Sequence, residues 1–193
     1  ARDRSQQERS HRLLGMNTTD LTELLGTNEH TRRAFRGVYA SDQLPNSCHP
    51  LSLYVFNTAP SHDSGEHWVC IYFGQHGRTC YFDSFGNHPS VESFENFLNE
   101  HASEWYCNVK PVQDITSPYC GHHVCFFSVY ICIGYSMHDI MSMYTNNLKT
   151  NDMLVKKFVH DNPLDNIVVN LHTGLPIVYN LYELVSITLH YMY

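Results

Sequence analysis

GEHWVCIYF, residues 65–73, is an apolar run that begins with a histidine and a tryptophan. Its apolar positions are continuous after His67, which predicts a strand that is covered on both faces. The turn residues of GQHG (74–77) follow, and RTCYFDSFG (78–86) is typical of a returning strand. A hairpin that turns at 74–77 would place His67 beside Asp83, because both residues stand near the open end of the two strands. The stretch therefore predicts a hairpin with a polar pair at one end.

The rest of the chain predicts an α+β domain with a central mixed sheet flanked by helices. Further strands are expected at residues 51–59 and 105–113. Helical spacing and capping signals predict helices at 20–26, 29–39, 91–98, 122–133, 137–147, 150–160 and from Pro176 onward. Asp20 is the expected cap of the first helix, and Gly26 is its expected stop. Residues 1–18 are expected to form a flexible N-terminal lead and residues 19–193 a single domain.

Charge and cysteine content argue against several classes of protein. The net charge of −7 disfavours a general affinity for nucleic acid, which needs clustered Lys and Arg to displace counterions. The seven cysteines are an odd number, and four of them sit inside apolar runs. This pattern indicates buried thiols in a reducing compartment and no disulfide framework. The longest apolar stretch, VCFFSVYICIG (124–134), is about half as long as a membrane-crossing helix, so no membrane partner is expected.

Cys120 stands just before the predicted buried helix, and this position favours a reactive thiol. The positive end of a helix stabilises a thiolate, and a nearby imidazole such as that of His67 would stabilise it further. Asp83 could accept a hydrogen bond from the other imidazole nitrogen and fix its orientation. The backbone N–H of Cys120 and the side-chain amide of Gln113, seven residues upstream, would then form an oxyanion hole. The four residues predict nucleophilic catalysis at a carbonyl group.

Each of these residues also has a simpler interpretation. Cys120 could be one more buried cysteine, His67 a surface histidine and Asp83 a turn residue. Trp68 could fill the core, or it could cover the imidazole of His67 and keep water away from it. A zinc site in CGHHVC (120–125) is disfavoured, because the stretch lacks the paired ligand modules of a structural site. No metal is expected.

Four stretches, GEHWVCIYF, CYFDSFG, VQDITSPYCG and CGHHVCFF, resemble the adenovirus-type maturation protease (adenain) family. That family belongs to the same clan as the SUMO-specific proteases. In both, a histidine followed by tryptophan opens a strand, an acidic residue lies about sixteen or seventeen positions later, and a glutamine precedes a Cys-Gly pair that opens the central helix. The matching positions here are His67 with Trp68, Asp83, Gln113, and Cys120 with Gly121. The resemblance runs from about residue 20 to about residue 180.

The resemblance implies roles for these residues and for activators. It implies a catalytic group and a substrate-binding pair, namely His67, Asp83, Gln113 and Cys120, and Trp68 with Gly121. Adenoviral enzymes usually carry Glu where this chain has Asp83. They are activated by DNA and by a short viral peptide that forms a disulfide with an enzyme cysteine. Cys107 lies in the corresponding region, closer to Gln113 than in the family pattern, and the net charge of −7 argues against DNA as an activator.

By resemblance, the expected function is that of a viral cysteine endopeptidase that cleaves structural precursor proteins after Gly-containing motifs during virion maturation. The chemistry needs no cofactor, and the expected partners are polypeptide substrates. The expected location is the virion and the host nucleus or cytoplasm. Two alternatives stay open. The same residues would serve a deubiquitinase or deSUMOylase, and the fold could also be a catalytically silent binding module.

Overall fold

The computed structural model describes residues 15–160 and confirms an α+β domain with a mixed sheet. The strands lie in chain order and are β1 (Phe35–Tyr39), β2 (Ser52–Asn57), β3 (Trp68–Phe73), β4 (Arg78–Asp83) and β5 (Glu104–Cys107). The outer pairs β1–β2 and β4–β5 are parallel, and the two central pairs are antiparallel. A short 3₁₀ turn, η1 (Gln75–Gly77), joins β3 to β4, where the sequence predicted the hairpin turn.

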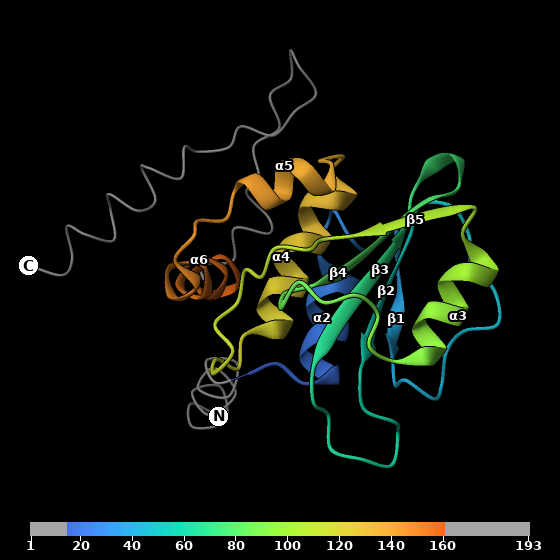
Figure 1. Ribbon diagram of the computed structural model, residues 1–193, viewed down its shortest axis with the longest axis horizontal. Helices are drawn as coiled ribbons and strands as arrows, with labels where there is room; N and C mark the ends of the chain where they lie inside the picture. The colour runs from blue at the N-terminus through green and yellow to red at the C-terminus, as the bar shows by residue number, and fades with distance from the viewer. Residues whose placement is uncertain (1–14, 161–193) are drawn as a thin grey trace, which may run out of the picture.

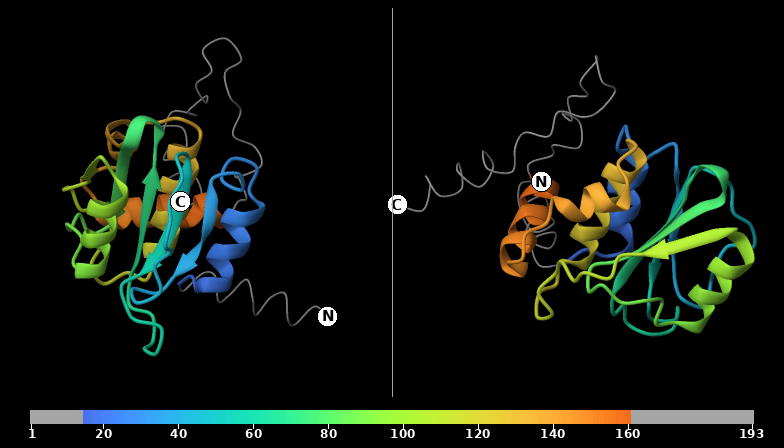
Figure 2. Two further views of the ribbon diagram at one scale, coloured as in Figure 1. Left: turned by 90° about the vertical axis from the view of Figure 1, so that its right-hand side faces the viewer. Right: turned by 45° about the horizontal axis from the view of Figure 1, so that its top comes forward.

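Helices cover both faces of this sheet (Figure 1). On one face lies α3 (Glu92–His101), and on the other lie α2 (Thr18–Thr27) and α4 (Cys120–Cys132). Two further helices, α5 (Met137–Ser142) and α6 (Leu148–His160), pack against α4. The rotated views show the same layers (Figure 2). The sheet is thus buried between helices, which explains why β3 is apolar along its length.

β3 contributes side chains to two hydrophobic cores, one on each face of the sheet. Cys70 lies in one core with Phe127 of α4, whereas Val69 and Ile71 lie in the other core with Phe94 of α3. Successive side chains of a strand point to opposite faces, so both sets must be apolar when both faces are covered. The two cores hold the β3–β4 hairpin between helices and fix the position of its end.

α4 is enclosed by protein on nearly all sides. Ten of its thirteen residues are buried, among them Phe126 and Val129. A helix that is apolar around its circumference is typical of a core helix. Cys120 is its first residue, so the prediction of a cysteine at the N-terminus of a buried central helix is confirmed. None of the helices between residues 15 and 160 has the length and apolar character that a membrane crossing needs.

The helix predicted at residues 29–39 is wrong. A turn occupies the first part of this range, and β1 occupies the rest, paired in parallel with β2. Pairing with a neighbouring strand outweighs the local helical preference here. The preceding helix, α2, also continues one residue past its expected stop at Gly26.

The strand predicted at residues 105–113 is correct only at its beginning. β5 ends at Cys107, because the next residue, Asn108, uses its side chain to bond the backbone at the end of β4. Pro111 then has no N–H with which to continue a strand ladder. The helix predicted from Pro176 lies outside the described residues.

The N-terminal segment differs from the expected lead. The side chain of Asn17, not that of Asp20, caps α2, and the two residues form a reciprocal capping box. Met16 is buried, and its carbonyl oxygen accepts a hydrogen bond of 2.8 Å from Nε1 of Trp68. Within the range of the expected lead, Met16 is therefore packed against the domain.

We expect Gly121→Ala to destabilise the fold, because a Cβ at this position would lie 2.8 Å from Cβ of Met16. Relief of this contact requires the buried N-terminal segment to move, and overpacking of this kind costs about 1–3 kcal/mol. Urea unfolding followed by circular dichroism measures the loss. Gly26→Ala is a matched control, since its Cβ would meet no atom closer than 3.9 Å. Equal unfolding midpoints for the two variants would contradict this packing role of Gly121.

Candidate active site

His67 and Asp83 form a hydrogen-bonded pair at the end of the β3–β4 hairpin. Nε2 of His67 lies 2.8 Å from Oδ1 of Asp83. Val69 is opposite Asp83 in the antiparallel register, so His67, just before β3, reaches the end of the partner strand. Asp83 is only 2% exposed, and a carboxylate so buried needs a polar partner. The predicted proximity of His67 and Asp83, based on a turn at residues 74–77, is therefore confirmed.

The Cys120 thiol lies beside the imidazole of His67 at the start of α4. Burial lowers the pKa of His67, but hydrogen bonds to Asp83 and Cys120 and the negative charges of both groups outweigh burial and raise it to about 9. Because Nε2 is engaged by Asp83, Nδ1 is the ring nitrogen left for the sulfur. A protonated imidazole next to a sulfur atom is the arrangement that stabilises a thiolate.

Phe85 covers the imidazole of His67. The two rings are stacked, with centroids 4.5 Å apart and an interplanar angle of 22°. The backbone N–H of Phe85 also donates to Oδ1 of Asp83 at 2.8 Å, so the carboxylate holds both the histidine and the residue that covers it. The sequence suggested Trp68 for this covering position and gave no indication of Phe85 beyond its place two residues after Asp83. Trp68 instead directs its indole N–H to the N-terminal segment.

Gln113 is buried next to Ser84, the residue that follows Asp83. Oγ of Ser84 donates to Oε1 of Gln113 at 2.5 Å, and Nε2 of Gln113 donates to the carbonyl oxygen of Ser117 at 2.8 Å. The backbone N–H of Gln113 also donates to the carbonyl oxygen of Ser84. Because a carbonyl oxygen only accepts, Ser117 determines which end of the amide carries the hydrogens, and the Ser84 hydroxyl holds the other end. One Nε2 hydrogen has no acceptor within the part of the chain that the structure describes.

Asn108 holds the backbone of Asp83 in place. Its Oδ1 accepts from the Asp83 N–H at 3.0 Å, and its Nδ2 donates to the Asp83 carbonyl oxygen at 2.6 Å. Asn108 is 3% exposed, so both bonds are shielded from water. The β4–β5 pairing ends at Tyr81 and Cys107, so no β5 residue pairs with Asp83, and the Asn108 side chain bonds the Asp83 backbone instead. Sequence reasoning missed this residue, because 25 positions separate it from Asp83 and no local pattern marks it.

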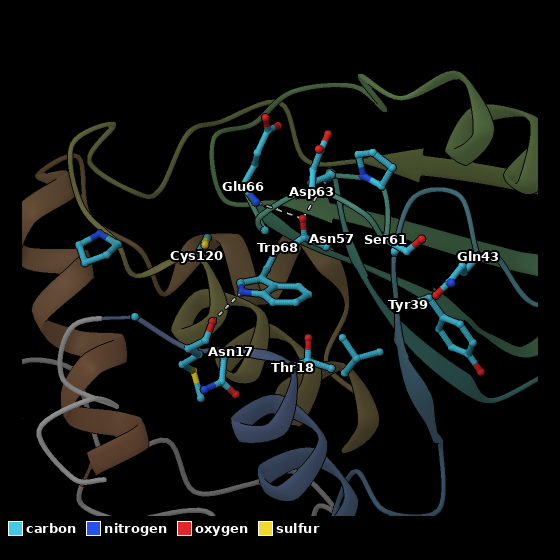
Figure 3. A pocket seen from close by; sticks show the side chains of 18 residues that line it. Asn17, Thr18, Tyr39, Gln43, Asn57, Ser61, Asp63, Glu66, Trp68 and Cys120 are labelled. Carbon is cyan, nitrogen blue, oxygen red and sulfur yellow. Dashed lines mark hydrogen bonds between the residues drawn. The ribbon is translucent and has the colours of Figure 1, made fainter. Parts of the chain in front are cut away.

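A cavity of about 530 Å³ opens beside the Cys120 thiol (Figure 3). The N-terminal segment, β1, the end of β2 and the loop before β3 form its walls, and its lining includes Tyr39, Gln43, Asn57, Glu66, Trp68 and Cys120. This volume is within the range of ligand sites in proteins. Trp68 and Cys120 therefore line the same cavity, and the substrate-binding role of Trp68 stays a prediction. Gly121 is not among the described residues that line the cavity and packs against Met16 instead.

Cys107 also lies apart from this cavity. It is the last residue of β5, partly buried against the core on the α3 face of the sheet. Burial and the nearby negative charge of Asp83 raise the pKa of its thiol, which disfavours the reactive thiolate. All seven cysteines of the chain are free thiols in this structure.

The histidines that follow Cys120 are buried within α4. His123 bonds Oδ1 of Asp152 through Nε2 at 2.9 Å and the hydroxyl of Tyr144 through Nδ1 at 3.2 Å. Burial lowers its pKa, although the hydrogen bond and charge of Asp152 act in the opposite direction. These contacts join α4 to α6. Within residues 15–160, no group of three or more His, Cys, Asp or Glu side chains is placed to hold a metal ion.

Comparisons with known proteins give distant similarities to solved structures. No protein-family model and no curated protein sequence matches the chain. A crystal structure of an ASFV protease shares 21% identity over 56% of this chain, with a TM-score of 0.42, and the chain spans 43% of that protease. The central domain of an uncharacterized Legionella pneumophila protein shares 11% identity over 76% of this chain and 98% of its own, with a TM-score of 0.43.

ChlaDub1 of Chlamydia trachomatis shares 14% identity over 79% of this chain and 82% of its own, with a TM-score of 0.40. All three identities are below 25% and all three TM-scores are below 0.5. The evidence for a function therefore lies in the site itself.

Proposed function

We propose that this protein is a cysteine peptidase with Cys120 as its nucleophile. The observation that supports this most directly is the imidazole of His67, which hydrogen-bonds Asp83 through Nε2 and has Cys120 as its other neighbour. An imidazole in this position can stabilise a thiolate and later supply a proton. The N-terminus of α4 adds a favourable field for the negative sulfur.

The reaction would begin with attack of the Cys120 thiolate on a peptide carbonyl carbon. The resulting oxyanion would accept hydrogen bonds from the Cys120 N–H and from the second Nε2 hydrogen of Gln113. Protonated His67 would give its proton to the leaving amine as the C–N bond breaks. Water, deprotonated by His67, would then hydrolyse the thioester and release Cys120. Asp83 would keep the imidazole in the required orientation throughout.

The sequence resemblance supports a more specific proposal. The substrates would be viral precursor proteins cut after Gly-containing motifs during maturation, within the virion or an infected cell. A short activating peptide that forms a disulfide with Cys107 belongs to the same proposal. DNA as an activator has less support, because the net charge is −7. Trp68, in the cavity wall beside Cys120, would limit the space for side chains near the cut bond.

Comparison of the chain ends of virion or lysate proteins incubated with active enzyme and with its Cys120→Ala variant tests this function. New N-termini that follow glycine and depend on Cys120 would support it. Fluorogenic ubiquitin and SUMO substrates, assayed in parallel, distinguish a deconjugating enzyme from a maturation protease. A protein that cleaves none of these and whose Cys120 reacts with iodoacetamide no faster than free cysteine would be a silent binding module.

We expect Ser84→Ala to reduce kcat by roughly 10- to 100-fold with little change in KM, because the Gln113 amide would lose its orientation in the transition state. Gln113→Ala should give a loss of similar or greater size. Ser84→Thr keeps the hydroxyl and should recover much of the rate. Ser128→Ala, a change at a buried serine about 12 Å along α4 from Cys120, serves as the control. Full activity in Ser84→Ala would contradict this positioning role.

A further inference from the structure

The cavity beside Cys120 has an acidic rim. Asp63 and Glu66 line it, and no lysine or arginine is among the described residues that do so. Both carboxylates are exposed, and they belong to the loop that leads into β3. Glu66 stands two residues before Trp68, which corresponds to roughly 7 Å along an extended chain. In Figure 3, Glu66 and Asp63 lie near the top of the view, and Trp68 and Cys120 lie below them.

The loop that carries these carboxylates is held at both ends. Oδ1 of Asn57 accepts hydrogen bonds from the backbone N–H groups of Ala59 and Glu66, at 2.9 and 3.1 Å. In the middle of the loop, the carboxylate of Asp42 accepts from the backbone N–H and the hydroxyl of Ser61, both at 2.8 Å. These bonds lower the pKa of Asp42, so it remains a further negative charge next to the rim. The acidic groups are therefore presented on an anchored loop.

Asn57 supplies a second feature that points to a ligand. It is 6% exposed and lines the cavity, yet its Nδ2 has no acceptor within residues 15–160. Nδ2 lies beside Gly65, where a Cβ would come within 2.7 Å of it. The absence of a side chain at Gly65 leaves this donor open. The carbonyl oxygen of an extended peptide in the cavity could accept a hydrogen bond from this open donor.

We propose that this cavity binds the peptide segment on the N-terminal side of the cut bond and selects a lysine or arginine in it. Asn57 donates from Nδ2 to a backbone carbonyl of that segment. Glu66 and Asp63 pair with the basic side chain, a few residues from the cut bond. This inference rests on the proposed peptidase function and adds a substrate preference to it. His62, whose Nε2 lies 3.9 Å from Oδ2 of Asp63, competes for that carboxylate only when protonated.

Irreversible peptide probes test the proposal without knowledge of the natural substrate. Acetylated tetrapeptides that end in glycine vinyl sulfone, with Lys or Glu placed in turn at each of the three other positions, alkylate a reactive cysteine. We expect the Lys probe to label Cys120 about five- to tenfold faster than the Glu probe at one or two positions, as exposed ion pairs would allow. The difference should shrink in 0.5 M salt, which screens exposed charges.

Charge variants identify the groups responsible. Glu66→Lys combined with Asp63→Lys should reverse the preference, and Glu66→Gln combined with Asp63→Asn should remove it. Glu95→Gln, a change at an exposed carboxylate of α3 that does not line the cavity, should leave it unchanged. Equal labelling of Cys120 by the Lys and Glu probes at every position would overturn the inference while leaving the peptidase proposal intact. Failure of every probe to label Cys120 faster than free cysteine would overturn both.

Discussion

Replacement of Cys120 by alanine is expected to abolish peptide cleavage and to leave the fold intact. The sulfur is the nucleophile that attacks the peptide in the proposed reaction, and removal of such an atom lowers kcat by at least about 10⁴-fold. The thiol is at the first residue of α4 and is only partly buried, so its loss creates no enclosed cavity in the core. Initial rates on a cleaved peptide and the thermal unfolding midpoint are the two measurements. The midpoint should change by no more than a few degrees.

Labelling with iodoacetamide at neutral pH gives an independent measure of the same residue. The wild-type protein should contain one fast-reacting thiol, and Cys120→Ala should contain none. Cys48→Ala is the matched control, because burial raises the pKa of Cys48 to about 11 and this partly exposed thiol should react slowly. That variant should keep both the fast-reacting thiol and full activity. Cleavage that survives in Cys120→Ala would refute the assignment of the nucleophile.

Replacement of Asp83 by alanine should lower kcat/KM by roughly 10²- to 10³-fold and also weaken the fold. The change removes the group that orients His67 and accepts the N–H of Phe85, so the imidazole loses its fixed position. A buried N–H left without an acceptor costs about 1–3 kcal/mol. Peptide kinetics and urea unfolding on the same preparation measure the two losses.

Asp83→Asn distinguishes the effect of the carboxylate charge on His67 from the effect of the hydrogen bonds that orient the imidazole. The amide oxygen of asparagine can still accept from Phe85, so much of the geometry and activity should persist. In the wild-type protein, activity should fall as pH rises through about 9, where His67 loses its proton. Loss of the carboxylate charge should move this fall in activity to lower pH, towards the ordinary histidine pKa of about 6.5. Stability should also fall as pH rises. Protonated His67 contributes fully to the free energy of unfolding below about pH 6.5, and this contribution disappears as pH rises through about 9.

Asp152→Asn is the control for this pair of variants. Asp152 is also buried and also bonds a histidine, His123, but it joins α4 to α6. Its replacement should lower stability without shifting the alkaline fall in activity. A shift of equal size in Asp152→Asn and Asp83→Asn would mean that global destabilisation, and not the charge next to His67, sets the pH profile.

The sequence by itself determined the features that depend on local geometry. The position of a turn at residues 74–77 was enough to predict that His67 meets Asp83, because antiparallel register follows from the turn. The apolar run after Cys120 was enough to predict a buried helix with that residue at its start. The residue types at these positions then indicated a nucleophile, a base and an orienting acid.

Tertiary structure alone decided what surrounds these residues. Ser84 and Phe85 immediately follow Asp83, yet nothing in their order shows that one bonds Gln113 and the other stacks on His67. The bond between Trp68 and Met16 spans 52 positions. Such contacts depend on how separately formed elements pack together, and short-range spacing carries no information about distances across the core. For the same reason the cavity, whose wall comes from separate segments of the chain, was visible only in the folded chain.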